Sequence, residues 1–163
     1  MNHKEIIDKL REDEHYYGKF GQQYLSNSNI KTLLSEPENL YNPIAKTPAM
    51  LIGGYFHTII LEPEKVKSFK IVESSSRNTK HYKEISDGEM CLLQEEADMV
   101  EAMTEKLLKN RFIESLITGS NMIYEEPAMG IINDLKWKAK ADIVNHDEHL
   151  VIDLKTTTNL DNF

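Results

Sequence analysis

The sequence is poor in cysteine. Its 163 residues include one, Cys91, so no disulfide can form within the chain. Small extracellular domains often depend on several disulfides, whereas proteins of reducing compartments do not. The N-terminus also lacks the apolar core of a secretion signal. These absences predict a cytoplasmic protein.

Long apolar runs and internal repeats are also missing. No stretch approaches the roughly 18 apolar residues of a membrane span, which excludes a membrane protein from the expected classes. The chain is 40% hydrophobic, with only five prolines and seven glycines. This composition favours a soluble globular protein with a sizeable core.

Positive charge is in deficit. The chain has 19 lysines and arginines against 27 aspartates and glutamates, giving a net charge of −8. Such a balance argues against non-specific coating of nucleic acid. It leaves room for a local basic groove, or for an acidic site neutralised by metal ions.

Helical spacing of apolar residues dominates the first 120 residues. Residues 66–88 are polar and rich in turn formers, and the stretch "SSSRNTKHYKEISDG", residues 74–88, is expected to be a surface loop. The predicted helices cover residues 1–20, a segment capped at Ser26–Ser28 and stopped by Pro37, a segment capped by Thr47 and ending at Pro63, a long segment from Ser86 or Asp87, and residues 111–118. Gly53 and Gly54 inside the third helix predict close approach of another segment, since each costs about 1 kcal/mol against alanine there.

From Asn121 the apolar period becomes alternating. Three antiparallel strands are predicted, with turns near Asn133-Asp134 and Asp147-Glu148. Helices followed by a meander of strands indicate an α/β protein with α+β order. We expect residues 1–23 to form an N-terminal helical extension and residues 24–163 a single domain. Trp137 is expected in the core, and His146 and His149 in solvent.

The stretch "KADIVNHDEHLVIDLKTTT", residues 140–158, reads as a hairpin with charges in both arms. If Asp147 and Glu148 form the tip, paired residues have numbers that add up to 295. Asp142 then faces Asp153 and Lys140 faces Lys155, while the other face is apolar. A different loop length would shift this register.

Two interpretations of the facing acids are open. In one, the hairpin has an ordinary solvated face on which the lysines neutralise the acids. In the other, the carboxylates share a hard divalent cation such as Mg²⁺, which prefers oxygen ligands. Similarly, a lone histidine on an apolar helix, such as His57, is more often a packed residue than a metal ligand.

A series of motifs favours the metal. In chain order these are "YLSNSNIKTLL", "GGYFHTIILEP", "EEP", "KWKAKADIV" and "VIDLKTT", spanning residues 24–158. The series resembles the exonuclease VIII (RecE-like) branch of the PD-(D/E)xK nuclease superfamily, which is related to the RecB nuclease domain and lambda exonuclease. The resemblance implies a restriction-endonuclease-like core and digestion of duplex DNA from its ends, a recombination-type activity of bacteria and phages.

The resemblance also implies roles for individual residues. Mg²⁺ or Mn²⁺ would be bound by His57, Asp142, Asp153 and the carbonyl of Leu154. The catalytic residues would be Asp142, Asp153, Lys155 and Glu126, with Glu125 as the alternative to Glu126. Lys136, Lys138, Lys140 and Thr156 would contact DNA. Arg77 and His81 are more simply residues of a surface loop.

The chain ends at Phe163, soon after the "VIDLKTT" motif. Members of the resembled family continue with a helix that carries Gln-x-x-x-Tyr and with a further strand. Their absence predicts self-association or a second chain that completes the fold, and a single-strand annealing protein is a further expected partner. The alternative function is a catalytically impaired nuclease-fold remnant that binds DNA or protein.

Overall fold

The computed structural model describes residues 1–157 and 159. The chain forms two compact units, one made of Met1–Ile44 and Ile123–Ile152, the other of Ala45–Met122 and the described residues from Asp153 onward. Residues 1–23 therefore share a unit with the long strands, which is a different division from the expected extension and single domain.

The first unit begins with two helices where one was expected. α1 (His3–Leu10) starts with a capping box between Asn2 and Glu5, and α2 (Asp13–Tyr17) follows after a break. Leu10 and Tyr16 are both buried, at 0% and 8% exposure. Six residues in one continuous helix would place these side chains about 120° apart around the helix axis. The break lets both of them enter the core.

The rest of the N-terminal segment is attached to the sheet. Leu25 pairs with Trp137 of β4, and the Leu25 amide donates to the Lys136 carbonyl at 2.8 Å. Trp137 is half-buried and donates from Nε1 to the carbonyl of Ile132 at 3.3 Å. The remaining helices of this segment are η1 (Gly21–Gln23), α3 (Asn27–Ser35), which Ser26 caps as predicted, and η2 (Pro37–Asn39).

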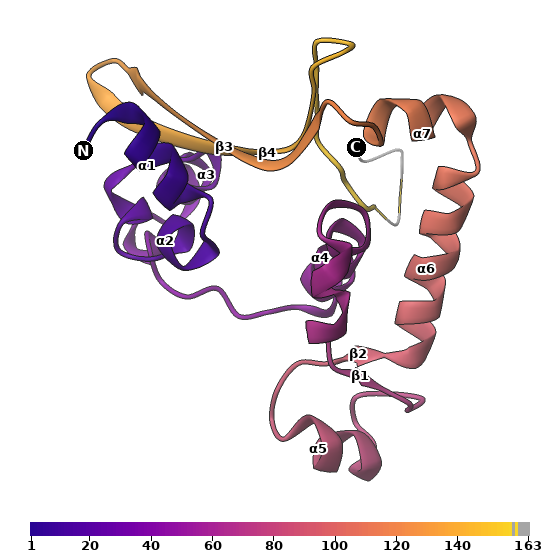
Figure 1. Cartoon of the computed structure of the whole chain (residues 1–163). Helices are drawn as coiled ribbons and strands as arrows, with labels where there is room; N and C mark the ends of the chain where they lie inside the picture. The colour runs from indigo at the N-terminus through magenta and orange to yellow at the C-terminus, as the bar shows by residue number, and fades with distance from the viewer. Residues whose placement is uncertain (158, 160–163) are drawn as a thin grey trace. The chain divides into compact units, whose positions relative to one another are not determined.

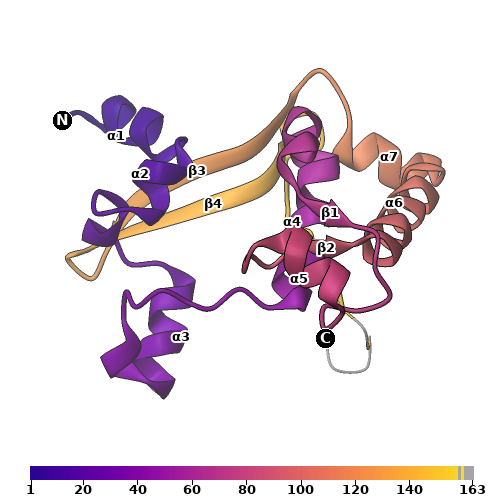
Figure 2. The ribbon, with the colours of Figure 1, turned by 90° about the horizontal axis from the view of Figure 1, so that it is seen from below.

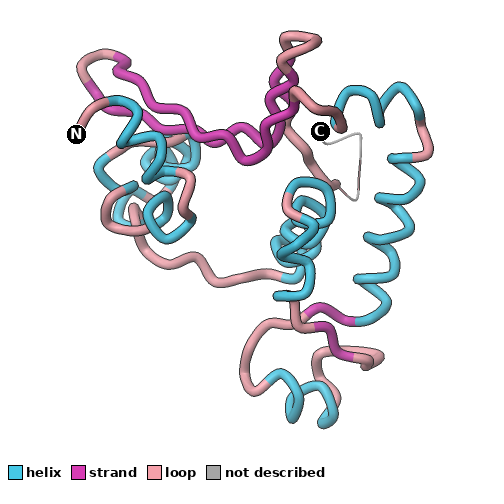
Figure 3. Tube along the Cα trace, viewed as in Figure 1, coloured by secondary structure: helices cyan, strands magenta, loops and turns pink. Residues whose placement is uncertain are grey.

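The strands confirm the predicted meander. β3 (Met122–Ile132), β4 (Leu135–Asn145) and β5 (Leu150–Ile152) form one sheet in that order, and Figure 3 shows β3 and β4 as long adjoining strands. Asn133 and Asp134 join them with φ values of 50° and 62°. Positive φ at both positions is typical of the two-residue turns that match strand twist.

The register of the second hairpin is the predicted one. Ile143 pairs with Ile152 and Asn145 with Leu150, so the paired numbers add up to 295. The ladder ends at Ile152, however, and the expected pairs of Asp142 with Asp153 and Lys140 with Lys155 are not part of it. Beyond Ile152 the chain leaves the strand conformation, and Thr156 lies against Gly53 of α4.

The second unit is built on two helices that pack together. α4 (Pro48–Leu61) is capped by the Thr47 hydroxyl, and α6 (Gln94–Leu108) lies beside it, as Figures 1 and 2 show. Tyr55 of α4 donates a hydrogen bond to Glu101 of α6 at 2.8 Å. Its ring also meets Phe69 edge-on, with centroids 5.1 Å apart. The helix prediction for this segment is confirmed.

The loop prediction for residues 74–88 was wrong for Lys80–Ser86, which form the helix α5. Tyr82 is buried, and its hydroxyl accepts from the Cys91 amide at 2.8 Å and donates to the Cys91 carbonyl at 3.1 Å. These bonds hold a short helix against a small parallel sheet. The elements are η3 (Pro63–Ser68), β1 (Ile71–Val72), α5 (Lys80–Ser86) and β2 (Leu92–Leu93).

The long helix starts later than predicted. Asp87, with φ of 51°, ends α5, so neither Ser86 nor Asp87 begins a helix. α6 starts at Gln94, after the Leu93 amide donates to the Glu96 carboxylate at 3.0 Å. Its buried residues are Ala97, Val100 and Thr104, whereas Met99 and Met103 are exposed. α7 (Arg111–Ile117) follows, as predicted.

None of the helices formed by the described residues combines the length and apolar character that a bilayer span requires.

Candidate metal centre

Two carboxylates meet on the long hairpin of the first unit. Glu125 of β3 is eight residues before Asn133, and Asp142 of β4 is eight residues after Asp134. Strands joined by a two-residue turn bring such equidistant positions together. A carboxylate oxygen of Glu125 lies within 4.8 Å of one of Asp142, and both residues are partly buried.

Glu125 has an unusual backbone for a strand residue. Its φ is 52°, in the left-handed region that glutamate rarely adopts. Such a conformation costs about 1 kcal/mol or more, and local distortions of a strand redirect side chains. The distortion falls on the residue that faces Asp142, as strained residues commonly do at functional sites.

Glu126 is engaged elsewhere. Arg11, which follows α1, donates from Nη2 to its Oε1 at 2.8 Å, and Nη1 lies 2.6 Å from Oε2. The sequence left the choice between Glu125 and Glu126 open. The geometry favours Glu125 as the partner of Asp142, because the two-point contact with Arg11 occupies Glu126.

Lys140 stands beside the carboxylate pair. Its side chain is only 9% exposed, and its ammonium lies 3.4 Å from Glu125 and 2.6 Å from Asp13 of α2. The rings of Tyr16 and Tyr17 lie 4.8 and 5.7 Å away. Burial alone would lower the pKa of Lys140, but the hydrogen bond to Asp13 and the nearby acids raise it. The ammonium therefore stays charged.

Lys136 and Lys138, at alternate positions of β4 before Lys140, differ in exposure. Lys138 donates to the backbone carbonyl of Tyr16, lies 4.2 Å from the Tyr16 ring, and has a pKa lowered by burial and then by Lys140. Gly21 permits this packing, since a Cβ there would lie 2.6 Å from the Lys138 ammonium. Lys136 is exposed, over the ring of Tyr24.

In the second unit, α4 carries His57, which is partly buried. Gly53 is one turn earlier on the same helix face, and a Cβ built on it would lie 3.3 Å from the Thr156 hydroxyl. The close approach predicted for Gly53 is confirmed. For Gly54 it was wrong, because no described atom lies within 4 Å of a Cβ built there. The segment after β5 thus packs on the face of α4 that bears His57.

That segment contains the remaining predicted residues. Asp153 and Lys155 form an ion pair of 2.6 Å, with side chains 63% and 54% exposed. Leu154, between them, is buried. Burial of Leu154 anchors the segment while the acid and the lysine on either side reach solvent.

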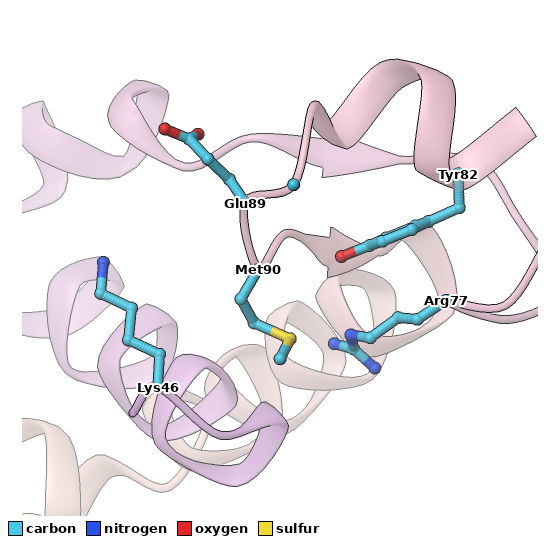
Figure 4. A pocket seen from close by; sticks show the side chains of 6 residues that line it. Lys46, Arg77, Tyr82, Glu89 and Met90 are labelled. Carbon is cyan, nitrogen blue, oxygen red and sulfur yellow. The ribbon is translucent and has the colours of Figure 1, made fainter. Parts of the chain in front are cut away.

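A separate hollow of about 530 Å³ lies in the second unit near α5 (Figure 4). The Tyr82 hydroxyl and the Arg77 guanidinium point toward Met90, and Glu89 points away. Both guanidinium ends of Arg77 donate to Glu96, one at 2.7 Å. Arg77 is therefore a structural residue that ties the segment before α5 to α6.

The donors on the hairpin suit a hard cation. Carboxylate oxygens at this separation repel each other, and a divalent ion between them removes the repulsion. Lys140 supplies part of that compensation from the chain itself. No sequence signal connects Asp13, Arg11 and Tyr16 with these acids, because they are more than 100 positions away in sequence.

Comparisons with known proteins identify the family and the fold. The family model of the PDDEXK-like domain of unknown function (DUF3799) matches residues 25–162. The fold is similar to the crystal structure of a Eubacterium rectale protein named "Putative exonuclease", with a TM-score of 0.56 and 16% sequence identity. The similarity covers 80% of this chain and 48% of the other, so the chain spans about half the length of that protein.

No curated protein was found to match the chain. The family model nevertheless extends over most of the sequence, including both strands of the carboxylate pair, α4 and the segment after β5. The chain belongs to the PDDEXK-like domain family DUF3799 and has its nuclease-like fold.

Proposed function

We propose that the chain is the nuclease core of a metal-dependent deoxyribonuclease that digests duplex DNA from its ends. The observation that carries the proposal is the approach of Glu125 and Asp142 within 4.8 Å on a fold of the PDDEXK class. The name of the Eubacterium rectale protein supports the exonuclease class. A recombination role in the cytoplasm of a bacterial or phage-infected cell follows from the sequence resemblance.

Mg²⁺ or Mn²⁺ is the proposed cofactor, and the residues present fit it. On the hairpin the proposed ligands are Glu125 and Asp142, and the sequence resemblance adds Asp153, His57 and the carbonyl of Leu154. Apart from the histidine, all donate oxygen, the atom that Mg²⁺ prefers. The ion would polarise the scissile phosphate and lower the pKa of water.

The protein's own groups have distinct tasks in this proposal. Lys155 orients the attacking water and exchanges its present ion pair with Asp153 for that contact. Lys136 and Thr156 are exposed and bind phosphate oxygens of DNA. Lys138 and Lys140 add positive charge along β4, although Tyr16 and Asp13 hold their ammonium groups.

The experiment uses end-labelled linear duplex DNA and a closed circular duplex, each with and without Mg²⁺. Wild-type protein should degrade the linear DNA only with Mg²⁺ and leave the circle intact. Asp142→Asn should abolish degradation. Asp134→Asn is the matched control, since it removes a carboxylate from the hairpin turn, where asparagine accepts positive φ. Degradation that persists in Asp142→Asn would contradict the proposal.

A binding function without catalysis is the second candidate. It is favoured by the ion pairs that the site acids already make with Lys140 and Lys155. These pairs compensate part of the negative charge of the site without a metal ion. DNA binding that is unchanged by Mg²⁺, with no degradation of either DNA, would support it.

Partner binding is part of the proposal. A single-strand annealing protein and a second copy of this chain are the expected partners. Sedimentation of the purified protein alone and with duplex DNA would separate self-association from assembly on the substrate.

A further inference from the structure

The helix α2 lies outside the residues that the family model matches, yet it contacts the site. The match begins at residue 25, whereas α2 covers Asp13–Tyr17. Asp13 and Lys140 are 127 positions apart in sequence, and their carboxylate oxygen and ammonium are separated by 2.6 Å. This contact joins a segment outside the matched residues to the strand that bears Asp142.

We infer that Asp13 is a positioning residue of the metal site, acting through Lys140. The inference rests on the proposed function, because it assumes that Glu125 and Asp142 bind a cation. Lys140 is nine-tenths buried and has one acid on each side, Asp13 and Glu125. Its position therefore depends on both of them.

Charge explains why Asp13 matters. A lysine ammonium 3.4 Å from a ligand carboxylate neutralises that carboxylate and repels an incoming cation. Asp13 offsets the lysine charge and draws the ammonium toward α2, which leaves Glu125 available to an ion. The two tyrosine rings close over Lys140 and keep it in this place.

Arg11 also supports the site, through Glu126, the residue next to Glu125. It fixes Glu126 by a two-point contact and so holds the adjacent backbone of β3, where Glu125 has its positive φ. The short segment Arg11–Asp13 thus contacts both neighbours of Glu125, since Arg11 binds Glu126 and Asp13 binds Lys140. Asp13 nevertheless makes the cleaner test, because its contact is with Lys140 alone among the ion pairs of the described residues.

The test is calorimetric titration of Mn²⁺ into the full chain. Asp13→Asn keeps the side-chain shape, removes the charge, and should weaken Mn²⁺ binding about tenfold, since an unbalanced lysine then faces the ion. Asp13→Glu keeps the negative charge and should bind Mn²⁺ with most of the wild-type affinity. Glu14→Gln is the matched control, with the same change of net charge at an exposed position of the same helix.

Each outcome is decisive. Equal Mn²⁺ affinity of wild type and Asp13→Asn would overturn the inference and leave the proposed function standing. Failure of the wild type to bind Mn²⁺ would overturn both. Circular dichroism of each variant verifies folding, and if Asp13→Asn unfolds, the comparison of Asp13→Glu with Glu14→Gln decides. Weaker binding in Asp13→Glu than in Glu14→Gln would then contradict the role of the charge.

Discussion

The carboxylates of Glu125 and Asp142 come from two strands joined by a two-residue turn and approach within 4.8 Å. Two like charges at this separation destabilise the folded chain unless a cation compensates them. Lys140 compensates in part, and the proposed metal ion would complete the compensation. Substitutions of Glu125 or Asp142 should therefore have other effects than substitutions of the acids next to them.

The adjacent glutamates should differ in function. Glu125→Gln removes an oxygen charge facing Asp142 and should weaken Mn²⁺ binding by at least tenfold in a calorimetric titration. Glu126→Gln should bind Mn²⁺ as the wild type does, because Glu126 faces Arg11. It should instead lower the free energy of unfolding by about 1 kcal/mol or less, as expected for a partly exposed ion pair. The reverse pattern would assign the site acid to Glu126.

Gly53 and Gly54 form a second matched pair. Gly54→Ala should raise the free energy of unfolding by about 1 kcal/mol, since alanine favours a helix interior and no described atom opposes its Cβ. Gly53→Ala meets the Thr156 hydroxyl at 3.3 Å, so its gain should be smaller and the segment of Asp153 should shift. Urea unfolding measures the first effect and DNA degradation the second. Equal behaviour of the two variants would argue against the packing of this segment on α4.

Tyr82→Phe tests the small parallel sheet. The substitution leaves the buried amide and carbonyl of Cys91 without the hydroxyl that now serves both. Unpaired buried polar groups should lower the free energy of unfolding by about 2–3 kcal/mol. Tyr41→Phe is the control, because its hydroxyl bonds to Gln22 from an exposed position and should cost far less. Similar losses in urea unfolding for both variants would contradict the structural role of Tyr82.

The Arg77–Glu96 pair predicts a pH dependence. Burial raises the pKa of Glu96, but the hydrogen bonds from Arg77 and the Leu93 amide outweigh it and bring the pKa below the ordinary 4.5. A lowered folded pKa stabilises the protein above 4.5, and this stability is lost as the pH falls through the folded value.

Glu96→Gln should therefore lower the free energy of unfolding by about 2 kcal/mol near pH 6. Its difference from the wild type should shrink below pH 4.5. Chemical unfolding over a pH series measures both effects, with Glu95→Gln at a neighbouring exposed position as the control. A difference that stays constant over the series would show that the charge of Glu96 is not the cause.

The strands and their turns could be predicted because the information is local. Alternating apolar residues and the Asn133-Asp134 pair are both read within a few positions, and the register of the second hairpin follows from its tip. The cap of α4 by Thr47 is equally local. Prediction failed for the start of α6, which lies at Gln94 and not at Ser86 or Asp87, because a separate helix, α5, extends to Ser86.

The candidate site also combines residues that local sequence motifs predict with residues that only the structure brings together. Asp142 was predicted from its motif, and the choice between Glu125 and Glu126 required the contact of Arg11. Asp13 could not be predicted at all, since its contact with Lys140 joins residues 127 positions apart. The ladder ends at Ile152, and the approach of Thr156 to Gly53 beyond it likewise joins residues far apart in sequence.

The positive φ of Glu125 has a consequence for engineering. Glycine or asparagine would fit this backbone better than glutamate does, yet neither carries a carboxylate. A laboratory selection for heat resistance alone would therefore favour replacement of Glu125, and the selected variants would be more stable proteins that lack a ligand of the proposed metal centre. Thermostability and the proposed ion binding thus place opposing demands on one position near the start of β3.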